Sequence, residues 1–226
     1  MRRWLLSLAL VAAGCGGSPA RETLPPETGA ILEAAIAAMS GVDTVAFSME
    51  RSGAPVEIED LEFASAEGRY AAPDSADALL SMRAGDLTVR LGTIAVGERV
   101  WLTNPLTGAW EQLDPGTGFN PAIVFDPRLG WVPLLGEDLS DPVYVGTEEV
   151  GGVEAHHLSG RIAARRIEAL TGGLVEPQDV AADLWFDAVS GRIAAMSFTT
   201  RGPGGDTHWR IDLSEYGAPV DIRPPG

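Results

Sequence analysis

The stretch ADLWFDAVSGRIAAMSF, residues 182–198, contains two runs in which large apolar side chains recur at every second position. Leu184 and Phe186 form the first run, and Met196 and Phe198 form the second. A glycine-containing turn at Ser190-Gly191 separates them. Alternation with a period of two is typical of strands that cover a core with one face only. The stretch therefore predicts a hairpin of antiparallel strands over 180–186 and 192–200.

The same periodicity recurs through most of the chain and predicts one long antiparallel sheet. Alternating sets lie near residues 45–49, 56–63, 87–91, 100–102, 143–150, 153–161 and 207–213. A change of phase near Asp60 predicts a bulge or bend. Two segments have helical spacing instead, 28–39 before Gly41 and 163–170. The order of these elements predicts the α+β class, with a meandering sheet and a few helices that cover one face.

The first residues predict export and lipid attachment. Arg2 and Arg3 precede a short apolar run that ends in LVAAGC, with Cys15 as the only cysteine of the chain. A basic start, an apolar core too short to span a bilayer and small residues before a cysteine are typical of a bacterial lipoprotein signal. We therefore expect cleavage after residue 14, lipid modification of Cys15, and anchoring at the extracytoplasmic face of the cell membrane. An ordinary secretory signal with an incidental cysteine is the alternative.

Composition limits the organisation and the partners of the mature chain. We expect a signal peptide over 1–14, an acylated cysteine and flexible tether over 15–26, and a single domain over 27–226. The formal charge is −16, and loss of Arg2 and Arg3 takes it to −18. Nucleic acid is therefore excluded as an expected partner, because phosphate binding needs clustered cations. A single cysteine also rules out an internal disulfide.

An apolar segment interrupts the strands between residues 119 and 135. Pro121, Pro127 and Pro133 divide FNPAIVFDPRLGWVPLL into pieces too short for a long helix. Such a segment either plugs the core or forms a lid over a pocket, since irregular structure has few regular hydrogen bonds to break when it moves. The candidate lid residues are its large apolar side chains, Phe119, Ile123, Val124, Phe125, Leu129, Trp131 and Leu134.

No catalytic constellation, metal site or cofactor motif is expected. His156 and His157 are adjacent, so on a strand they would point to opposite faces and could not share a metal. The chain has no G-x-S-x-G motif, P-loop or G-x-G-x-x-G motif. Arg165 and Arg166 are candidates for contact with an anionic lipid headgroup, although such arginines more often neutralise nearby carboxylates.

The order of the elements resembles a family of actinobacterial envelope lipoproteins, the LppX/LprA/LprF/LprG group. The likeness covers roughly residues 27–225. It is carried by GVDTVAFSME, ERVWLTN, AWEQL, NPAIVFDPRLG, VEAHHLSGRI, ADLWFDAVSGRIAAMSF, WRIDLSEYG and PVDIRPP. The resemblance implies a strongly bent antiparallel sheet, a half-barrel similar in shape to LolA and LolB, with helices that cover its concave face around a hydrophobic cavity. It also implies a lipid-modified cysteine, matching Cys15, and no catalytic residue.

The resemblance further implies that the cavity holds acyl chains of envelope lipids or glycolipids, which the protein carries or presents. A lipid exporter is a possible partner. The alternative function is an envelope sensor or interaction module of the same fold that recognises a protein or peptide. The candidate cavity residues are the apolar members of the alternating strands, Val45, Phe47, Met49, Leu87, Val89, Leu91, Val100, Leu102, Leu184, Phe186, Met196 and Phe198.

Overall fold

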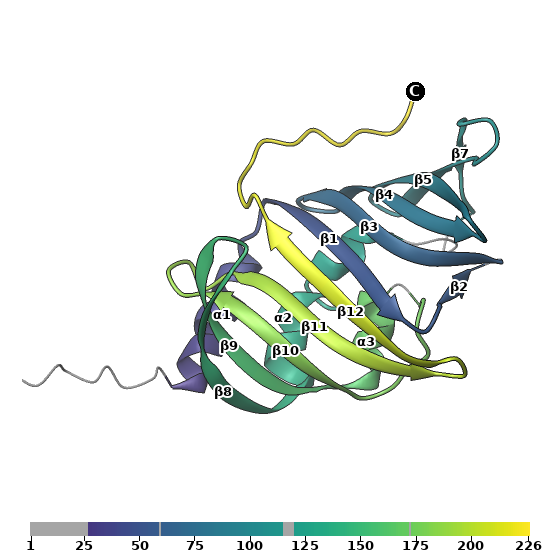
Figure 1. The fold of residues 1–226 in the computed structure, drawn as a ribbon. Helices are drawn as coiled ribbons and strands as arrows, with labels where there is room; N and C mark the ends of the chain where they lie inside the picture. The colour runs from purple at the N-terminus through teal and green to yellow at the C-terminus, as the bar shows by residue number, and fades with distance from the viewer. Residues whose placement is uncertain (1–26, 59, 115–119, 172) are drawn as a thin grey trace, which may run out of the picture.

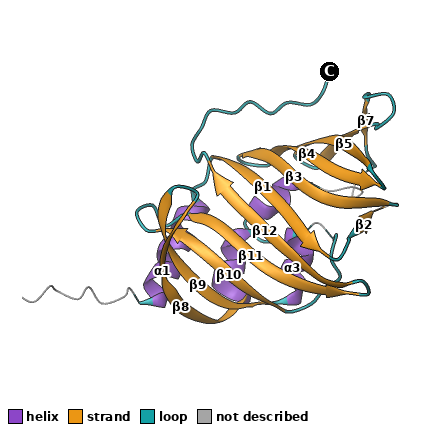
Figure 2. Cartoon of the chain, viewed as in Figure 1, coloured by secondary structure: helices purple, strands orange, loops and turns teal. Residues whose placement is uncertain are grey.

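The structure is a computed structural model that describes residues 27–58, 60–114, 120–171 and 173–226. In these residues twelve strands form one open antiparallel sheet. The strand order is β7-β6-β5-β4-β3-β1-β12-β11-β10-β9-β8, with β2 paired to β3. The sheet is strongly bent, and the helices lie together on one of its faces (Figures 1 and 2). The expected α+β class with a half-barrel sheet is confirmed.

The first part of the chain supplies one helix and the strands from the centre of the sheet to one edge. These elements are α1 (Thr28–Ser40), β1 (Thr44–Gly53), β2 (Glu57–Ile58), β3 (Leu61–Ala71), β4 (Ser75–Ala84), β5 (Leu87–Val96), β6 (Arg99–Thr103) and β7 (Trp110–Gln112). Helix α1 agrees with the prediction and buries Ile31, Ala35 and Met39, one stripe of its surface.

Three short helical pieces follow in the apolar segment. They are η1 (Pro121–Phe125), the single turn α2 (Trp131–Pro133) and η2 (Leu134–Asp138). We call residues 121–138 the cover segment. The rest of the sheet and the last helix come from β8 (Leu139–Val150), β9 (Val153–Ile162), α3 (Ala164–Leu170), β10 (Val180–Asp187), β11 (Ile193–Gly202) and β12 (Gly205–Ser214).

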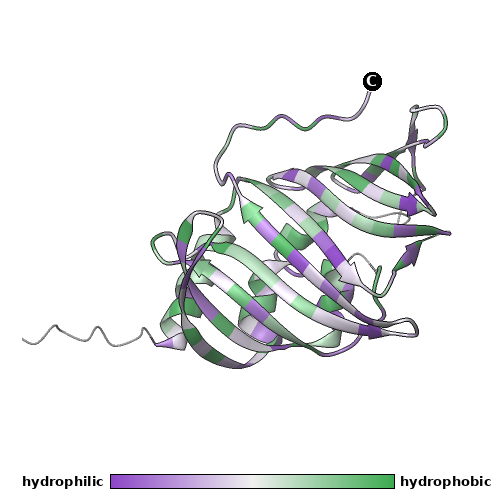
Figure 3. Ribbon diagram, viewed as in Figure 1, coloured by the Kyte–Doolittle hydropathy of each residue, from purple (hydrophilic) through white to green (hydrophobic). Residues whose placement is uncertain are grey.

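The middle of the sheet joins the two ends of the folded chain. Strand β1 lies between β3 and β12, and Phe47 is opposite both Gly68 of β3 and Leu213 of β12. Directly opposite residues of antiparallel strands share a face. Because Leu213 is buried in the core that the helices cover, this row marks the inner face of the sheet. The alternation of apolar and polar residues along the strands is visible in Figure 3.

The chain reverses at Asp60, which the sequence predicted as a bulge or bend. Ile58 of β2 is opposite Leu61 of β3, so the phase of the apolar pattern restarts because a new strand begins. Asp60 has a φ of 67°, in the left-handed region. Aspartate tolerates this conformation better than most residues. The change of phase in the apolar pattern is therefore caused by a tight hairpin turn between β2 and β3.

Candidate functional site: an apolar hollow beneath the cover segment

The inner face of the sheet does not pack completely against its cover. A hollow of about 20 Å³ remains where strands β1, β3 and β12 face η1, α2 and α3. All nine lining residues have apolar or aromatic side chains, namely Phe47, Met49, Ala66, Pro121, Val124, Trp131, Leu170, Ile211 and Leu213. The sheet therefore supplies the floor of the hollow, and the cover segment with α3 supplies its roof.

The hollow is closed in this conformation. A volume of about 20 Å³ is close to what a single water molecule needs. Pockets that hold drug-sized ligands usually measure about 300–1,000 Å³. An acyl chain could therefore enter only if the roof moved away from the sheet.

A side-chain cap and a glycine fix the path of the backbone around the cover segment. Asn120 caps η1, its side-chain oxygen accepting a 2.9 Å hydrogen bond from the backbone N–H of Ala122. A Cβ atom added at Gly130 would lie 2.1 Å from the carbonyl oxygen of Val124, so only glycine lets α2 approach η1 this closely. The cover segment therefore consists of short turns that pack closely against one another at Gly130.

Two contacts hold the cover segment in place. The ring of Phe125 stacks on Tyr70 of β3, with 4.3 Å between the centroids. At the other end, Arg166 of α3 binds buried Asp138 with 2.6 Å between Nε and Oδ2, and its Nη1 donates to the carbonyl oxygen of Arg128 at 3.3 Å. We call the Asp138–Arg166 pair the latch, since it ties two points of the cover segment to one helix.

Burial also affects the Tyr70 hydroxyl. It raises the pKa of this group, and the nearby charges of Asp74, Asp126 and Asp43 raise it further. The hydroxyl donates a 2.9 Å hydrogen bond to the carbonyl oxygen of Pro73. Tyr70 therefore remains protonated at neutral pH and anchors Phe125 as a neutral ring.

The structure places most of the expected cavity residues on the inner face. Two of the twelve, Phe47 and Met49, line the hollow itself. Val89 and Leu102 are partly buried against the same core, and Val100 is buried opposite Ala95. The remaining buried members of the core are Val45, Leu91, Leu184, Phe186, Met196 and Phe198.

Leu87 is the exception, and its expected place in the cavity is wrong. Its side chain is 70% exposed at the first position of β5. The residue has the correct parity for the inner face but lies beside the turn at Gly85, beyond the layer that the helices cover. Periodicity predicts a face, whereas burial also depends on how far along the strand the cover extends.

The expected lid residues fall into three groups. Val124 and Trp131 line the hollow, and Leu134 is fully buried behind it. Ile123 and Phe125 are partly buried, while Leu129 is 45% exposed. Phe119 lies outside the described residues, as do Cys15 and the expected tether.

The two arginines expected to meet a headgroup both contact Asp138. Arg166 is buried in the latch, and its expected role at a headgroup is wrong because its guanidinium is already bound on two sides. Arg165 also pairs with Asp138, but its side chain remains 68% exposed. Burial of Asp138 explains the pairing, since a buried carboxylate needs a cation close by.

Sequence reasoning missed several residues that form the site. Ile211 and Leu213 belong to an alternating strand that was predicted, so their pattern could have identified them. Ala66 has no such signal because its side chain is small. Asp138 was also missed, since nothing in the sequence links it to an arginine 28 positions later.

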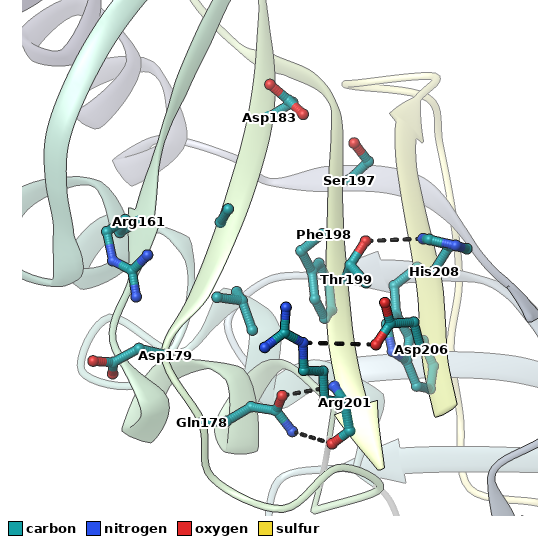
Figure 4. Close-up of a pocket in the computed structure, with 13 residues that line it drawn as sticks. Arg161, Gln178, Asp179, Asp183, Ser197, Phe198, Thr199, Arg201, Asp206 and His208 are labelled. Atoms are coloured by element: carbon teal, nitrogen blue, oxygen red, sulfur yellow. Dashed lines mark hydrogen bonds and ion pairs between the residues drawn. The ribbon is translucent and has the colours of Figure 1, made fainter. Parts of the chain in front are cut away.

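A second hollow lies on the outer face of the sheet over β9–β12, with a volume of about 500 Å³ (Figure 4). Its polar groups bind one another. Thr199 and His208 are 2.9 Å apart, Gln178 exchanges hydrogen bonds with the backbone of Arg201, and the Arg201 side chain is 3.7 Å from Asp206. This groove is polar and several of its side chains are paired, so it does not offer the apolar surface of the inner hollow.

The two adjacent histidines lie on opposite sides of β9. His157 is opposite Trp185 and stacks on its ring at 4.6 Å, while His156 is opposite Phe186. In the described part of the chain, no group of three or more His, Cys, Asp or Glu side chains is arranged to hold a metal ion. Within the same residues, every helix is too short or too polar to cross a membrane.

Comparison with known proteins agrees with this architecture. A family model described as LppX_LprAFG lipoprotein matches residues 27–222. The chain belongs to this lipoprotein family. The resemblance seen in the sequence is therefore confirmed over almost the whole region in which it was expected. No curated protein matches the chain.

Two solved structures share the fold. LprF from Mycobacterium bovis is 19% identical, with a TM-score of 0.69, and the match covers 89% of this chain and 98% of LprF. LppX from Mycobacterium tuberculosis is 17% identical, with a TM-score of 0.60, over 87% of this chain and 98% of LppX. At this level of identity the likeness concerns the fold alone, the open bent sheet with its helical cover.

Proposed function

We propose that this protein binds acyl chains of envelope lipids or glycolipids between the inner face of the sheet and the cover segment, and carries or presents them across the cell envelope. The observation that supports this proposal is the wholly apolar hollow under a cover made of short turns. Its nine lining residues offer hydrocarbon contact without directional demands. No bond is made or broken in this function.

The free-energy cost of exposing acyl chains to water is large enough to require a protein site that shields them. Exposure of a methylene group to water costs about 0.8 kcal/mol, so an acyl chain of about sixteen carbons costs about 12 kcal/mol. A lipid with two chains leaves a bilayer at a useful rate only if a protein offers an equally apolar interior. The hollow lies where Phe47, Met49 and Leu213 provide such an interior once the roof opens.

Anchoring at the membrane fits the same role. We propose that Cys15 carries acyl groups and attaches residues 27–226, as one domain, to the extracytoplasmic face of the cell membrane. Stable attachment takes two or more chains. The formal charge of −16 opposes adhesion to anionic headgroups, so the anchor rather than the surface would hold the domain there. A membrane lipid exporter is the partner that this place in the envelope favours.

Native mass spectrometry tests the proposal directly. The mature chain from residue 15 with Cys15→Ser would be produced in a host with a bacterial envelope, and solvent-extracted lipids would be identified. We expect one bound diacyl lipid per chain, or uptake of a fluorescent acyl probe by lipid-free protein. Protein that carries no lipid and takes up no probe, even at a temperature where the cover segment exchanges its amide hydrogens, would refute it.

One observation favours a second candidate function, recognition of a protein or peptide partner. Strand β8 is an edge of the sheet in the described residues, and its Val143 and Val145 are 59% and 56% exposed. An exposed edge can accept an added strand from a peptide. A stoichiometric partner lost on the substitution Val143→Asp, from a protein that binds no lipid, would favour this function over the first.

A further inference from the structure

A groove of about 550 Å³ crosses strands β12, β1, β3, β4 and β5 on the outer face of the sheet and ends at Trp110 of β7. Small side chains form part of its floor, since Ala46 of β1 is opposite Ser214 of β12, and Ser48 is the next outward residue of β1. Ala46 and Ser48 flank Phe47, which lines the hollow. Because side chains alternate along a strand, this site, which we call the Trp110 groove, lies on the opposite face from the hollow.

The sheet makes room for Trp110 and leaves it open to solvent. Strand β7 is an edge of the sheet in the described residues (Figure 1). The ring reaches over Gly92 of β5, where an added Cβ atom would lie 2.9 Å from Trp110 Cη2. Trp110 is nevertheless 38% exposed. Tryptophan combines a large apolar surface with a polar N–H, and it is enriched where proteins bind other molecules. Its position over a glycine therefore indicates a binding surface.

The hairpin between β6 and β7 holds Trp110 in this position. The side-chain oxygen of Asn104 accepts hydrogen bonds from the backbone N–H groups of Leu106 and Thr107, at 3.0 and 3.2 Å. The side-chain amide of Asn104 donates to the Glu111 carboxylate at 3.0 Å. Asparagine is favoured in turns because it makes such local hydrogen bonds. Trp110 is therefore presented by an ordered turn, which reduces the entropy lost when a ligand binds.

Charged groups of both signs lie beside the aromatic end of the groove. Arg69 of β3 pairs with Asp77 of β4, with 3.0 Å between Nη2 and Oδ2, and the Arg69 side chain is 56% exposed. Glu67 is exposed, and its carboxylate has no hydrogen-bond or ion-pair partner among the described residues. Leu79 is opposite Glu67 and continues the apolar lining toward Trp110. The groove therefore combines hydrogen-bond donors, acceptors and apolar surface on neighbouring strands.

We propose that the Trp110 groove binds a neutral carbohydrate chain, a ligand separate from the lipid of the inner hollow. A sugar ring has an apolar face of C–H groups and a rim of hydroxyl groups, each of which can donate and accept hydrogen bonds. The apolar face lies against Trp110, and the hydroxyl groups bind the carboxylate of Glu67 and the guanidinium of Arg69. Hydrogen bonds to charged groups are stronger than those between neutral groups, so these contacts favour a ligand rich in hydroxyl groups.

Other classes of ligand fit the groove less well. The carboxylates of Glu67 and Asp77 repel a polyanion, as does the formal charge of −16 on the chain, while Arg69 repels a cation. An extended peptide binds a sheet by adding a strand at an edge, but β1, β3 and β4 each have a paired strand on both sides. Recognition in this groove therefore depends on side chains, which suits a neutral ligand with many hydroxyl groups.

Affinity electrophoresis in native gels tests the inference. The mature chain with Cys15→Ser is run through gels that contain mannan, galactan, arabinan or glucan, and through a gel with polygalacturonate as the acidic comparison. We expect at least one neutral polysaccharide to retard the protein and polygalacturonate to leave its mobility unchanged. Trp110→Ala should weaken the binding about tenfold or more, because the apolar contact is lost. Glu67→Gln should weaken it about three- to tenfold, because a charged acceptor becomes neutral.

Gly92→Ala tests the position of the ring without removing it. The added methyl group displaces the indole from its place over β5, so binding should fall toward that of Trp110→Ala. Two controls change similar exposed side chains outside the groove. Leu87→Ala removes an exposed apolar side chain of β5, and Glu50→Gln removes an exposed charge from the outer face of β1. Both should bind polysaccharide like the unsubstituted chain, and thermal unfolding shows that each variant is folded.

Three results would overturn the inference. They are no retardation by any of the four neutral polysaccharides, retardation by polygalacturonate alone, and retardation that survives both Trp110→Ala and Glu67→Gln. Each of them leaves the proposed function standing, since the lipid would bind on the opposite face of the sheet. Failure of the acyl probe to bind, in turn, refutes the proposed function and leaves the Trp110 groove as argued.

Discussion

The two halves of the sheet bury their inner faces to different degrees. In the half formed by β8–β12, large inner-face residues such as Leu158, Leu184 and Met196 are completely buried. In the half formed by β3–β7, Leu61, Leu80 and Leu102 are only partly buried, although Phe63 and Met82 are buried. The inner face of β8–β12 is therefore the more completely covered of the two. We call β8–β12 the solid half and β3–β7 the partly covered half.

The difference comes from side-chain size as well as from the helices. Small residues occupy central inner positions of β3 and β4, including Ala66, Gly68 and Ala78. Close packing requires that neighbours fill whatever space such residues leave. At Gly68 the ring of Phe47 fills it, since a Cβ atom added there would lie 2.7 Å from Phe47 Cζ. The hollow lies at the border between the halves. Under the proposed function, the solid half would hold the fold while the other half opens to the lipid.

Of the substitutions that test this comparison, we expect one in the latch to lower the free energy of unfolding the most. Asp138→Asn would leave the Arg166 guanidinium buried without a counter-charge, and we expect a loss of about 3–5 kcal/mol in the free energy of unfolding. Urea denaturation measures the loss. Asp221→Asn, which breaks the exposed pair with Arg223, is the control and should change little. A loss below about 1 kcal/mol for Asp138→Asn would show that the cover segment does not depend on the latch.

Truncation of one leucine in each half tests the difference in packing. Leu184→Ala creates a cavity in the solid half and should cost about 3 kcal/mol or more. Leu80→Ala in the partly covered half should cost about 1 kcal/mol, because less apolar surface is lost and the neighbourhood is already loose. Thermal unfolding of both variants measures the contrast. Equal losses would mean that the two halves are packed alike.

Replacement of an alanine by leucine tests whether the unfilled volume on the inner face lies at the hollow. Ala66→Leu places extra carbons into the hollow and should cost about 1 kcal/mol, while it competes with an acyl probe for the same space. Ala182→Leu on β10 has no hollow to enter and should cost about 2–3 kcal/mol. Denaturant titrations and probe binding are measured on both. Full probe binding by Ala66→Leu would place the ligand elsewhere.

Alkaline pH tests the hydrogen bond between Tyr216 and Ile193 of β11, in the solid half. Burial raises the pKa of Tyr216, although the charge of Arg192 opposes the shift, and the hydroxyl donates to the Ile193 carbonyl oxygen at 2.6 Å. The folded protein therefore holds this proton more tightly than the unfolded chain. Its contribution is complete below about pH 10 and decreases as the pH rises further, by at most about 1.4 kcal/mol per pH unit.

The substitution Tyr216→Phe should remove this part of the alkaline slope and cost about 1 kcal/mol at neutral pH, where the hydrogen bond is lost. Chemical denaturation between pH 8 and pH 11 measures both effects. Tyr70→Phe repeats the test in the other half, where burial also raises the pKa of the tyrosine. An unchanged slope in the Tyr216→Phe protein would contradict the assignment.

Much of the fold could be predicted because its signals are local. The apolar stripe of 28–39 and its stop at Gly41 gave α1, and alternation gave both strands of the hairpin around Ser190-Gly191. Strand β4 gave no such signal. Ala76 and Ala78 are too small to mark a face, and the adjacent pair Leu79-Leu80 breaks the alternation.

The site was harder to predict because it depends on contacts between distant segments. The proline-broken segment was identified as a plug or a lid, but its fixed points, Tyr70 and Arg166, follow only from the folded chain. Residues that line the hollow through their smallness, such as Ala66, have no periodic signal at all. The latch also shows why an arginine pair near an expected cavity need not meet a headgroup.

The pairing of β1 with β12 has a consequence for the order of events during folding. Phe47 of β1 and Leu213 of β12 lie opposite one another in the floor of the hollow, yet they belong to the first and the last strand in chain order. Contacts so distant in the sequence form late and slowly. The floor therefore cannot exist until the last strand has been synthesised and has paired with the first.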